Sequence, residues 1–147
     1  MRGFFEIGIY HNKTPSNLGT LWRSAYQLGA SGIFVIGKRY PKQGSDTIKA
    51  YRHIPLREYE DFDHFQNSRP YDCVLIGIEI GKNILEEFSH PQRAIYLLGA
   101  EDNGLPENVL QKCQTTIGLS AINTLSYNVS VAGSIVMYHR QFLQTRL

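Results

Sequence analysis

The stretch Leu97-Leu98-Gly99-Ala100-Glu101-Asp102-Asn103-Gly104-Leu105-Pro106 gives the clearest indication of the fold. The apolar run Arg93–Leu98 leads into it and is short, which is typical of a strand buried on both faces of a sheet. Pro106 stands where the first turn of a helix tolerates proline. We therefore interpret this stretch as a buried strand that passes through an acidic, glycine-bracketed turn into a helix.

The same alternation continues on both sides of this stretch. Further apolar runs predict strands at Phe4–Tyr10, Gly32–Ile36, Cys73–Ile80 and Thr115–Leu119. Helical patterns fall at Ser16–Leu28, Glu58–Phe65, Ile84–Phe88, Pro106–Lys112 and Tyr127–Leu143. Strands that alternate with helices predict an α/β fold with a mostly parallel sheet and helices on both faces.

Composition indicates an ordinary globular protein. The 147 residues fit one domain spanning residues 1–147, and 42% hydrophobic against 19% charged residues argues against disorder. A formal charge of +2 and a pI of 8.6 permit nucleic-acid binding without indicating it. No apolar run approaches the roughly 20 residues of a membrane span, so we expect a cytoplasmic protein. Cys73 and Cys113 lie far apart with no His cluster, which predicts buried thiols and no metal site.

The glycine-bracketed turn differs from two nucleotide-binding motifs. Its G-x-x-x-x-G spacing has Leu105 where a phosphate loop needs lysine, and no G-x-G-x-x-G occurs in the chain. An acidic turn at the carboxyl end of a strand suits a ligand of positive or hydrogen-bond-donor character. A sulfonium that carries an amino acid and a nucleoside has both.

Two other segments carry polar residues beside predicted helices. In residues 17–30, Arg23 lies opposite the apolar stripe of an amphipathic helix, and Asn17 lies near its start. Ser126 and Asn128 stand at the entrance of the long C-terminal helix. From the pattern alone, a solvated arginine and capping residues explain them.

The region around Lys38, Arg39 and Lys42 is the most basic part of the chain and resembles a loop. It is either a solvated loop or a contact for RNA phosphates, since cations interleaved with an aromatic suit backbone neutralisation and base stacking.

Taken together, three segments resemble the SpoU/TrmH branch of the SPOUT RNA methyltransferases. Residues 17–30 match N-x-G-x-x-x-R-x-A-x-x-x-G-A, residues 98–105 match L-G-x-E-x-x-G-L, and residues 126–132 match S-x-N-V-S-x-A. Their order and spacing cover nearly the whole chain. One departure is Ile117-Gly118-Leu119, where the family has proline in the middle; glycine keeps the backbone close to a ligand but loosens the turn.

The resemblance implies a C-terminal trefoil knot and S-adenosylmethionine as the cofactor, bent among the knot loops. The residues it implies for cofactor binding are Ile78, Leu98, Gly99, Ile117, Leu119, Leu125 and Ser126. It also makes Arg23 the catalytic residue, with Asn17, Glu101, Ser126 and Asn128 orienting Arg23 and the substrate. Because arginine stays protonated in proteins, we favour a role in holding phosphate and ribose while the hydroxyl proton leaves late.

The function implied by the resemblance is RNA 2′-O-ribose methylation. The chain resembles a bare catalytic domain, and small members of this shape act on tRNA, so tRNA is favoured over rRNA. A catalytically silent RNA-binding module and a knotted methyltransferase that acts on a base nitrogen are the alternatives. The presence of Arg23, Glu101 and Asn128 argues against the first, and the form of the first motif argues against the second.

The C-terminal helix predicts a homodimer independently of the family. One apolar stripe comprises Val131, Ile135, Tyr138 and Phe142, and the next comprises Val129, Ala132, Val136 and Leu143. Together they span roughly 180°, where a surface helix needs little more than about 100°. One stripe can pack on the sheet, and a two-fold contact is an economical cover for the other. The alternative is a helix fully buried within one chain.

Overall fold

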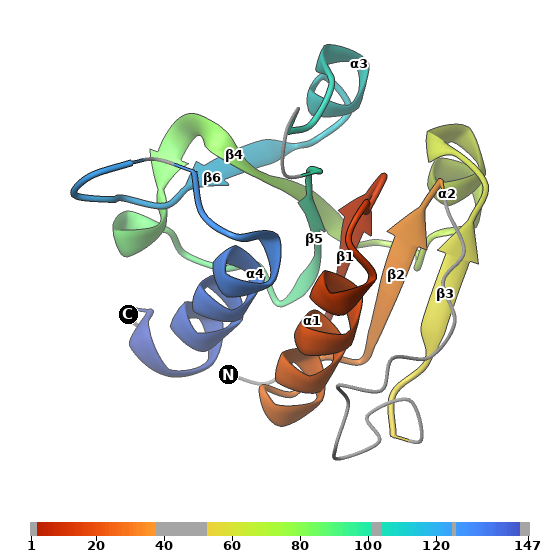
Figure 1. Ribbon diagram of the computed structural model, residues 1–147, viewed down its shortest axis with the longest axis horizontal. Coiled ribbons are helices and arrows are strands. Elements are labelled where there is room, and N and C mark those ends of the chain that lie inside the picture. Colours follow the sequence, from red (N-terminus) through yellow and green to blue (C-terminus); the bar gives the residue numbers. More distant parts are fainter. Residues whose placement is uncertain (1–2, 38–52, 101–103, 125, 145–147) are drawn as a thin grey trace.

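The computed structural model describes residues 3–37, 53–100, 104–124 and 126–144, and it contains a six-stranded sheet in which every pairing is parallel (Figure 1). The strand order is β3-β2-β1-β5-β4-β6. The strands are β1 (Phe4–Tyr10), β2 (Gly32–Ile36), β3 (Leu56–Tyr59), β4 (Val74–Ile84), β5 (Arg93–Leu98) and β6 (Thr115–Gly118). Since all strands point the same way, their carboxyl ends meet at one edge.

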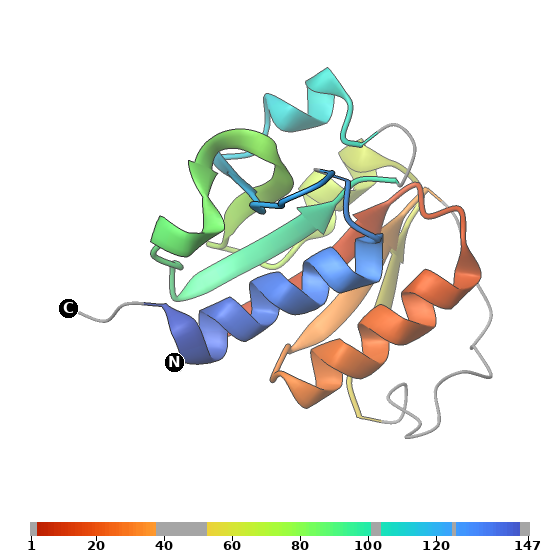
Figure 2. The same cartoon turned by 60° about the vertical axis from the view of Figure 1, so that its left-hand side comes forward.

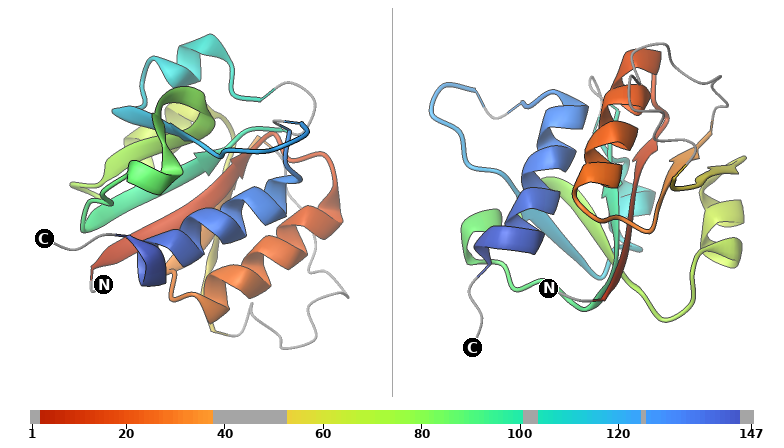
Figure 3. Two further views of the ribbon diagram at one scale, coloured as in Figure 1. Left: turned by 90° about the vertical axis from the view of Figure 1, so that its left-hand side faces the viewer. Right: turned by 90° about the horizontal axis from the view of Figure 1, so that it is seen from below.

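Helices cover both faces of this sheet, as the sequence predicts (Figures 2 and 3). On one face, α1 (Pro15–Gln27) and α4 (Val129–Tyr138) share a core with alternate residues of β1, such as Ile7 and Ile9. On the other, α2 (Phe62–Ser68) and α3 (Glu107–Leu110) pack near Phe34 and Leu97. No helix in the described ranges is long and apolar enough to cross a membrane.

Side-chain hydrogen bonds join α1 and α4 along their length. The Asn128 Nδ2 donates to Asn17 Oδ1 at 3.1 Å near the start of both helices, and the Ser134 hydroxyl donates to Ser24 Oγ at 2.9 Å further on. The order of these contacts shows that the two helices run parallel. Asn128 also caps α4, because its Oδ1 accepts from the backbone N–H groups of the next turn. Capping is wrong for Asn17, which lies inside the first turn of α1.

The region before α2 departs from the sequence prediction. Glu58 and Tyr59 belong to β3, a short edge strand, and the helix begins only at Phe62 after its N-cap Asp61. Arg57 and Glu58 of β3 are charged and exposed, so this strand lacks the apolar run that identifies the buried strands. The helix predicted at Ile84–Phe88 is also wrong: Ile84 pairs with Gly118 in the sheet, and only a 3-10 turn, η2 (Leu85–Glu87), follows.

After α4 the chain continues as a π-helical turn, η3 (His139–Leu143), which changes the faces that its residues present. Arg140 is 1% exposed there, which is rare for an arginine unless its guanidinium is paired. Its guanidinium donates to Pro91 O at 2.7 Å, Gln92 O at 2.9 Å and the Tyr96 hydroxyl at 3.0 Å. The wider turn thus fixes the C-terminal helix to the start of β5.

The exposure of α4 and η3 bears on the two predicted stripes. Val129, Ala132 and Val136 are buried as expected, but Leu143 of the same stripe is 62% exposed because the π-helical turn alters the phase. The other stripe is uncovered: the exposed side chains are Val131, Ile135, Tyr138 and Phe142. A helix buried entirely within one chain is therefore wrong.

Candidate functional site

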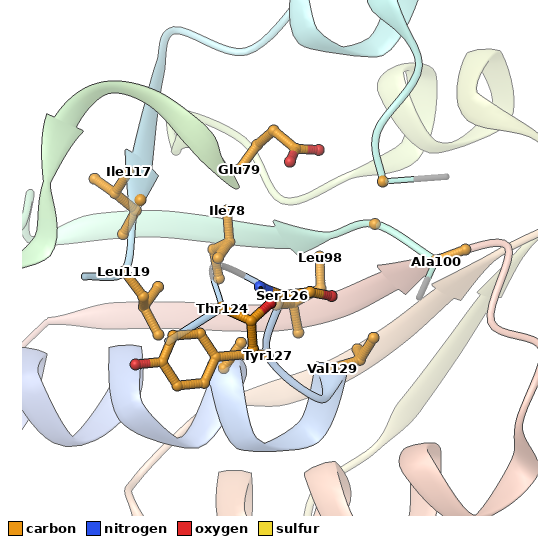
Figure 4. Close-up of a pocket in the computed structure, with 14 residues that line it drawn as sticks. Ile78, Glu79, Leu98, Ala100, Ile117, Leu119, Thr124, Ser126, Tyr127 and Val129 are labelled. Atoms are coloured by element: carbon orange, nitrogen blue, oxygen red, sulfur yellow. Dashed lines mark hydrogen bonds between the residues drawn. The ribbon is translucent and has the colours of Figure 1, made fainter. Parts of the chain in front are cut away.

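A cavity of about 380 Å³ opens at the carboxyl ends of β5 and β6 and beside the middle of β4, where its register against β6 shifts (Figure 4). Its walls come from these three strands, from the segment before α4 and from the first turns of that helix. The described residues that line it are Ile78, Glu79, Leu98, Gly99, Ala100, Gly104, Ile117, Gly118, Leu119, Thr124, Ser126, Tyr127, Val129 and Ala132. A parallel sheet brings these distant segments together because all of its strands end at one edge.

The glycines that bracket the predicted turn are required by close packing. A Cβ on Gly99 would overlap the backbone of Gly104, and Gly104 itself has φ of +62°, which favours glycine. The Gly104 N–H donates to Ala100 O at 2.9 Å and closes the base of the turn. Glu101 lies outside the described residues, so its predicted role stays a prediction.

Glu79 also lines the cavity, although it is not one of the residues predicted to bind the cofactor. Its Oε2 accepts the backbone N–H of Leu105 at 3.0 Å, and a Cβ on Gly104 would strike this carboxylate. The register of β4 against β6 shifts between Ile78 and Asn83, and Glu79 stands at the start of this irregularity. The available signal was a single carboxylate inside the otherwise apolar run Cys73–Ile80.

Glu79 sets the charge of the cavity, since it is the only acidic or basic residue among the described residues that line it. The remaining walls offer apolar side chains, a hydroxyl at Thr124 and Ser126, and open main chain at Gly99 and Gly118. This lining suits a mostly apolar ligand with donor groups or positive charge, the class that the sequence predicted.

Most of the predicted cofactor residues meet in this one cavity. They are Ile78, Leu98, Gly99, Ile117, Leu119 and Ser126. The seventh, Leu125, lies outside the described residues, as do the predicted RNA contacts Lys38, Arg39 and Lys42. Gly118, where the family pattern has proline, lies in β6 and faces the cavity.

The predicted catalytic residues are more spread out. Ser126 lines the cavity, whereas Asn17 and Asn128 bond each other at the helix starts behind it. Arg23 is half-buried on α1, eight residues after Pro15, which corresponds to about 12 Å along the helix axis from its first turn. Within the described lining, a single chain does not supply Arg23 to the cavity.

A second polar cluster lies away from the cavity, beneath η3. His90 Nδ1 is 2.6 Å from the Tyr96 hydroxyl, and its Nε2 is 2.9 Å from His139 Nδ1. Burial, with His139 and Arg140 nearby, lowers the pKa of His90 to about 3, and burial raises the pKa of Tyr96 to about 12. These groups serve packing of the C-terminal turn.

The two cysteines and the potential metal ligands can be placed within the described chain. No group of three or more His, Cys, Asp or Glu residues there could hold a metal ion. Cys73 is buried as expected, while Cys113 is only partly buried. Burial raises the pKa of both thiols, that of Cys113 to about 11, which keeps them protonated and unreactive.

Comparison with known proteins gives a consistent match. The family described as "SpoU rRNA Methylase family" matches residues 5–138. The mouse protein "tRNA (guanosine(18)-2'-O)-methyltransferase TARBP1" is 26% identical over 141 residues, which is 88% of this chain and 9% of that protein. This chain therefore spans a small part of that relative's length.

Solved structures share the fold. The AdoMet-bound rRNA methyltransferase from Sinorhizobium meliloti superposes with a TM-score of 0.85 at 22% identity, covering 98% of this chain and 59% of that one. A structure titled "Structural insights into the 2-OH methylation of C/U34 on tRNA" has a TM-score of 0.83 at 24% identity and covers 96% of both chains.

Proposed function

Because the chain belongs to the SpoU rRNA Methylase family, we propose that it transfers a methyl group from S-adenosylmethionine to a ribose 2′-hydroxyl of RNA. The observation that carries the proposal is the cavity, which gathers predicted cofactor residues from β4, β5, β6 and the segment before α4. We favour tRNA as the substrate, because the mouse relative is named for 2′-O-methylation of tRNA and the structure that matches over 96% of both chains is titled for 2-OH methylation on tRNA.

The cavity fits S-adenosylmethionine in size and chemistry. Its volume of about 380 Å³ falls within the range of about 300–1,000 Å³ for small-molecule sites. Ile78, Leu98 and Leu119 offer apolar walls, and the open backbone at Gly99 and Gly118 can meet the polar edges of a nucleoside. The Glu79 carboxylate supplies an anionic acceptor for the cofactor's positive groups.

The bound cofactor would supply an electrophilic methyl group on sulfur. The protein's task is to align the ribose oxygen with that methyl group and to accept or stabilise the departing proton. We assign Arg23 to this task, holding phosphate and ribose, with Asn17, Glu101, Ser126 and Asn128 orienting the reacting groups. The Asn17–Asn128 bond supports this role because it fixes the two helix starts beside the cavity.

We further propose that the protein acts as a homodimer whose partner subunit supplies Arg23. The uncovered stripe of α4 adjoins a strongly apolar groove of about 460 Å³, lined by Leu28, Leu85, Glu86, Ser134, Ile135, Tyr138, His139 and Leu143. An exposed apolar face of this kind marks an interaction surface. A two-fold contact through it would cover the stripe and bring the partner's α1 near the cavity.

Three expectations from the sequence complete the proposal. We propose one domain over residues 1–147, a cytoplasmic location, where RNA and S-adenosylmethionine are both found, and a trefoil knot. The chain path supports the knot: from β6 at the sheet edge it returns past the ends of β4 and β5 to α4 beside α1.

The test of the proposed reaction uses tRNA from cells that lack the gene, the purified protein and tritiated S-adenosylmethionine. We expect label in one 2′-O-methyl nucleoside, identified by mass spectrometry. Arg23→Ala should abolish transfer while calorimetry shows cofactor affinity within a few-fold. Label on a base nitrogen, or RNA binding without any transfer, would favour the two alternatives.

The shared site has its own test by complementation. Leu119→Trp, which fills the cavity, should be inactive, as should Arg23→Ala. Mixed and refolded together in equal amounts, they form heterodimers in which one of the two cavities is intact and faces an intact Arg23. About a half of wild-type activity should therefore return per heterodimer, or about a quarter for the whole mixture, in which roughly half of the dimers are heterodimers. A mixture that stays inactive would place Arg23 and the cavity in the same subunit.

A further inference from the structure

A second cavity of about 270 Å³ lies beside the first, at the carboxyl end of β1. Its described lining consists of Tyr10, His11, Lys13, Ala100, Gly104 and Pro106. Ala100 and Gly104 line the larger cavity too, so the two cavities share a wall. The volume lies below the range of about 300–1,000 Å³ for whole small-molecule sites, so it suits one ring system.

An aromatic pair forms one side of this cavity. The rings of Tyr10 and His11 stack with centroids 4.0 Å apart and planes 10° from parallel. A Cβ on Gly37 would overlap the His11 ring, so this glycine leaves room for the ring beside the end of β2. Proteins that bind single-stranded RNA use exposed, fixed aromatic rings of this kind to stack an unpaired base.

The backbone holds His11 in an uncommon conformation. Its φ is +53°, a left-handed value that costs energy for a residue with a side chain, and its N–H donates to Ile36 O at 2.8 Å. The next residue, Asn12, is 1% exposed, and its Nδ2 has no hydrogen-bond partner among the described residues. Strain and an unmet buried donor concentrate at functional sites, and here both flank the cavity.

Positive charge stands on the other side of the aromatic pair. Lys13 lines the cavity and directly precedes Thr14, the N-cap of the 13-residue helix α1. The N-terminus of a helix carries a partial positive charge, which adds to the attraction that a lysine exerts on an anion. The cavity thus offers three groups to one nucleotide. Its base could stack on the aromatic pair, its ribose could lie over the wall that the two cavities share, and its phosphate could lie near Lys13.

We propose that this cavity is the subsite for the nucleotide that is methylated: its base stacks on His11, its phosphate lies near Lys13, and its ribose reaches over the shared wall toward the larger cavity. The proposal rests on the RNA methyl transfer proposed above, and it adds the residues that receive the target base. His11 and Lys13 precede Asn17, so none of the three motifs includes them.

The test compares steady-state methylation of tRNA from cells lacking the gene by four variants. His11→Asn removes the ring but tolerates the left-handed backbone, and Lys13→Gln removes the charge. Loss of base stacking should raise the KM for tRNA between about 5-fold and 150-fold with little change in kcat. Lys13→Gln should also lower the slope of log affinity against log salt by about 0.7 to 0.9.

The matched controls lie at other places on the surface. Tyr71→Ala removes a ring that is 90% exposed beyond the amino end of β4, and Lys112→Gln removes an exposed lysine after α3. Both should leave the KM for tRNA unchanged. Calorimetry with S-adenosylmethionine should give wild-type affinity for every variant, which shows that each is folded.

Two negative outcomes are distinguishable. If the wild type methylates tRNA and the His11 and Lys13 variants match it in KM and salt slope, the nucleotide subsite is overturned and the proposed reaction stands. If the wild type binds S-adenosylmethionine but methylates no RNA, the proposed reaction fails and the subsite fails with it.

Discussion

Replacement of the buried Arg140 by Met tests how the C-terminal turn is held. Arg140→Met keeps much of the side-chain volume but removes the donors to Pro91 O, Gln92 O and the Tyr96 hydroxyl. It also removes a guanidinium that lies 4.8 Å from the centre of the Phe5 ring. Each acceptor left without a donor costs about 1 to 1.5 kcal/mol, so we expect the free energy of unfolding to fall by about 3 to 4 kcal/mol.

Urea denaturation followed by circular dichroism, at one fixed protein concentration, measures this loss. With a urea dependence of about 2 kcal/mol per molar, the midpoint should fall by roughly 1.5 to 2 M. Arg93→Met is the matched control, because Arg93 also donates to two carbonyls and lies 5.0 Å from the centre of the Phe4 ring but is exposed. It should cost less than about 1 kcal/mol. Equal losses in the two variants would refute the argument that burial sets the cost.

Three further predictions follow from the buried histidines, the apolar face and the basic segment. Because the pKa of His90 falls from 6.5 to about 3 on folding, unfolded chains bind a proton at this residue before folded chains do as the pH drops. The free energy of unfolding should therefore fall between pH 6.5 and pH 3, by up to about 1.4 kcal/mol per pH unit from this residue. His90→Gln should flatten that part of the curve of stability against pH. In light scattering at low micromolar concentration, the wild type should have the mass of a dimer and Phe142→Glu or Val131→Glu that of a monomer; a monomeric wild type that still methylates RNA would contradict the proposed dimer. Replacement of Lys38, Arg39 and Lys42 together should weaken RNA binding and reduce its salt dependence by roughly three units of slope at most, whereas an unchanged slope would indicate a solvated loop.

The sheet could be predicted from the sequence where strands are buried on both faces. Gly32–Ile36 and Arg93–Leu98 are the same ranges in the prediction and in the structure, because continuous apolar runs of this length have few alternatives. β3 was missed because Leu56-Arg57-Glu58-Tyr59 is an edge strand whose polar residues face solvent. The helical pattern at Glu58–Phe65 placed the start of α2 too early, because the helix begins only after its N-cap Asp61.

The apolar residues that line the cavity could be predicted from the sequence, whereas the buried polar residues could be predicted less well. Ile78, Leu98 and Ile117 follow from resemblance in sequence, and the parallel sheet brings them to one cavity. Glu79 and Arg140 depend on partners 26 and more than 40 residues away, which local patterns do not report. Their environments arise only when the crossover connections have placed the strands side by side.

The dependence of the last helix on distant strands has a consequence for synthesis on the ribosome. α4 packs across β1 and β5, and η3 holds the start of β5 through Arg140, so the central strands keep an uncovered apolar face until residue 140 has emerged. Contacts this far apart in sequence form slowly, and exposed apolar strands favour aggregation meanwhile. Nascent chains that are stalled before α4 should therefore recruit chaperones and resist compaction, while chains stalled well beyond η3 should resist protease.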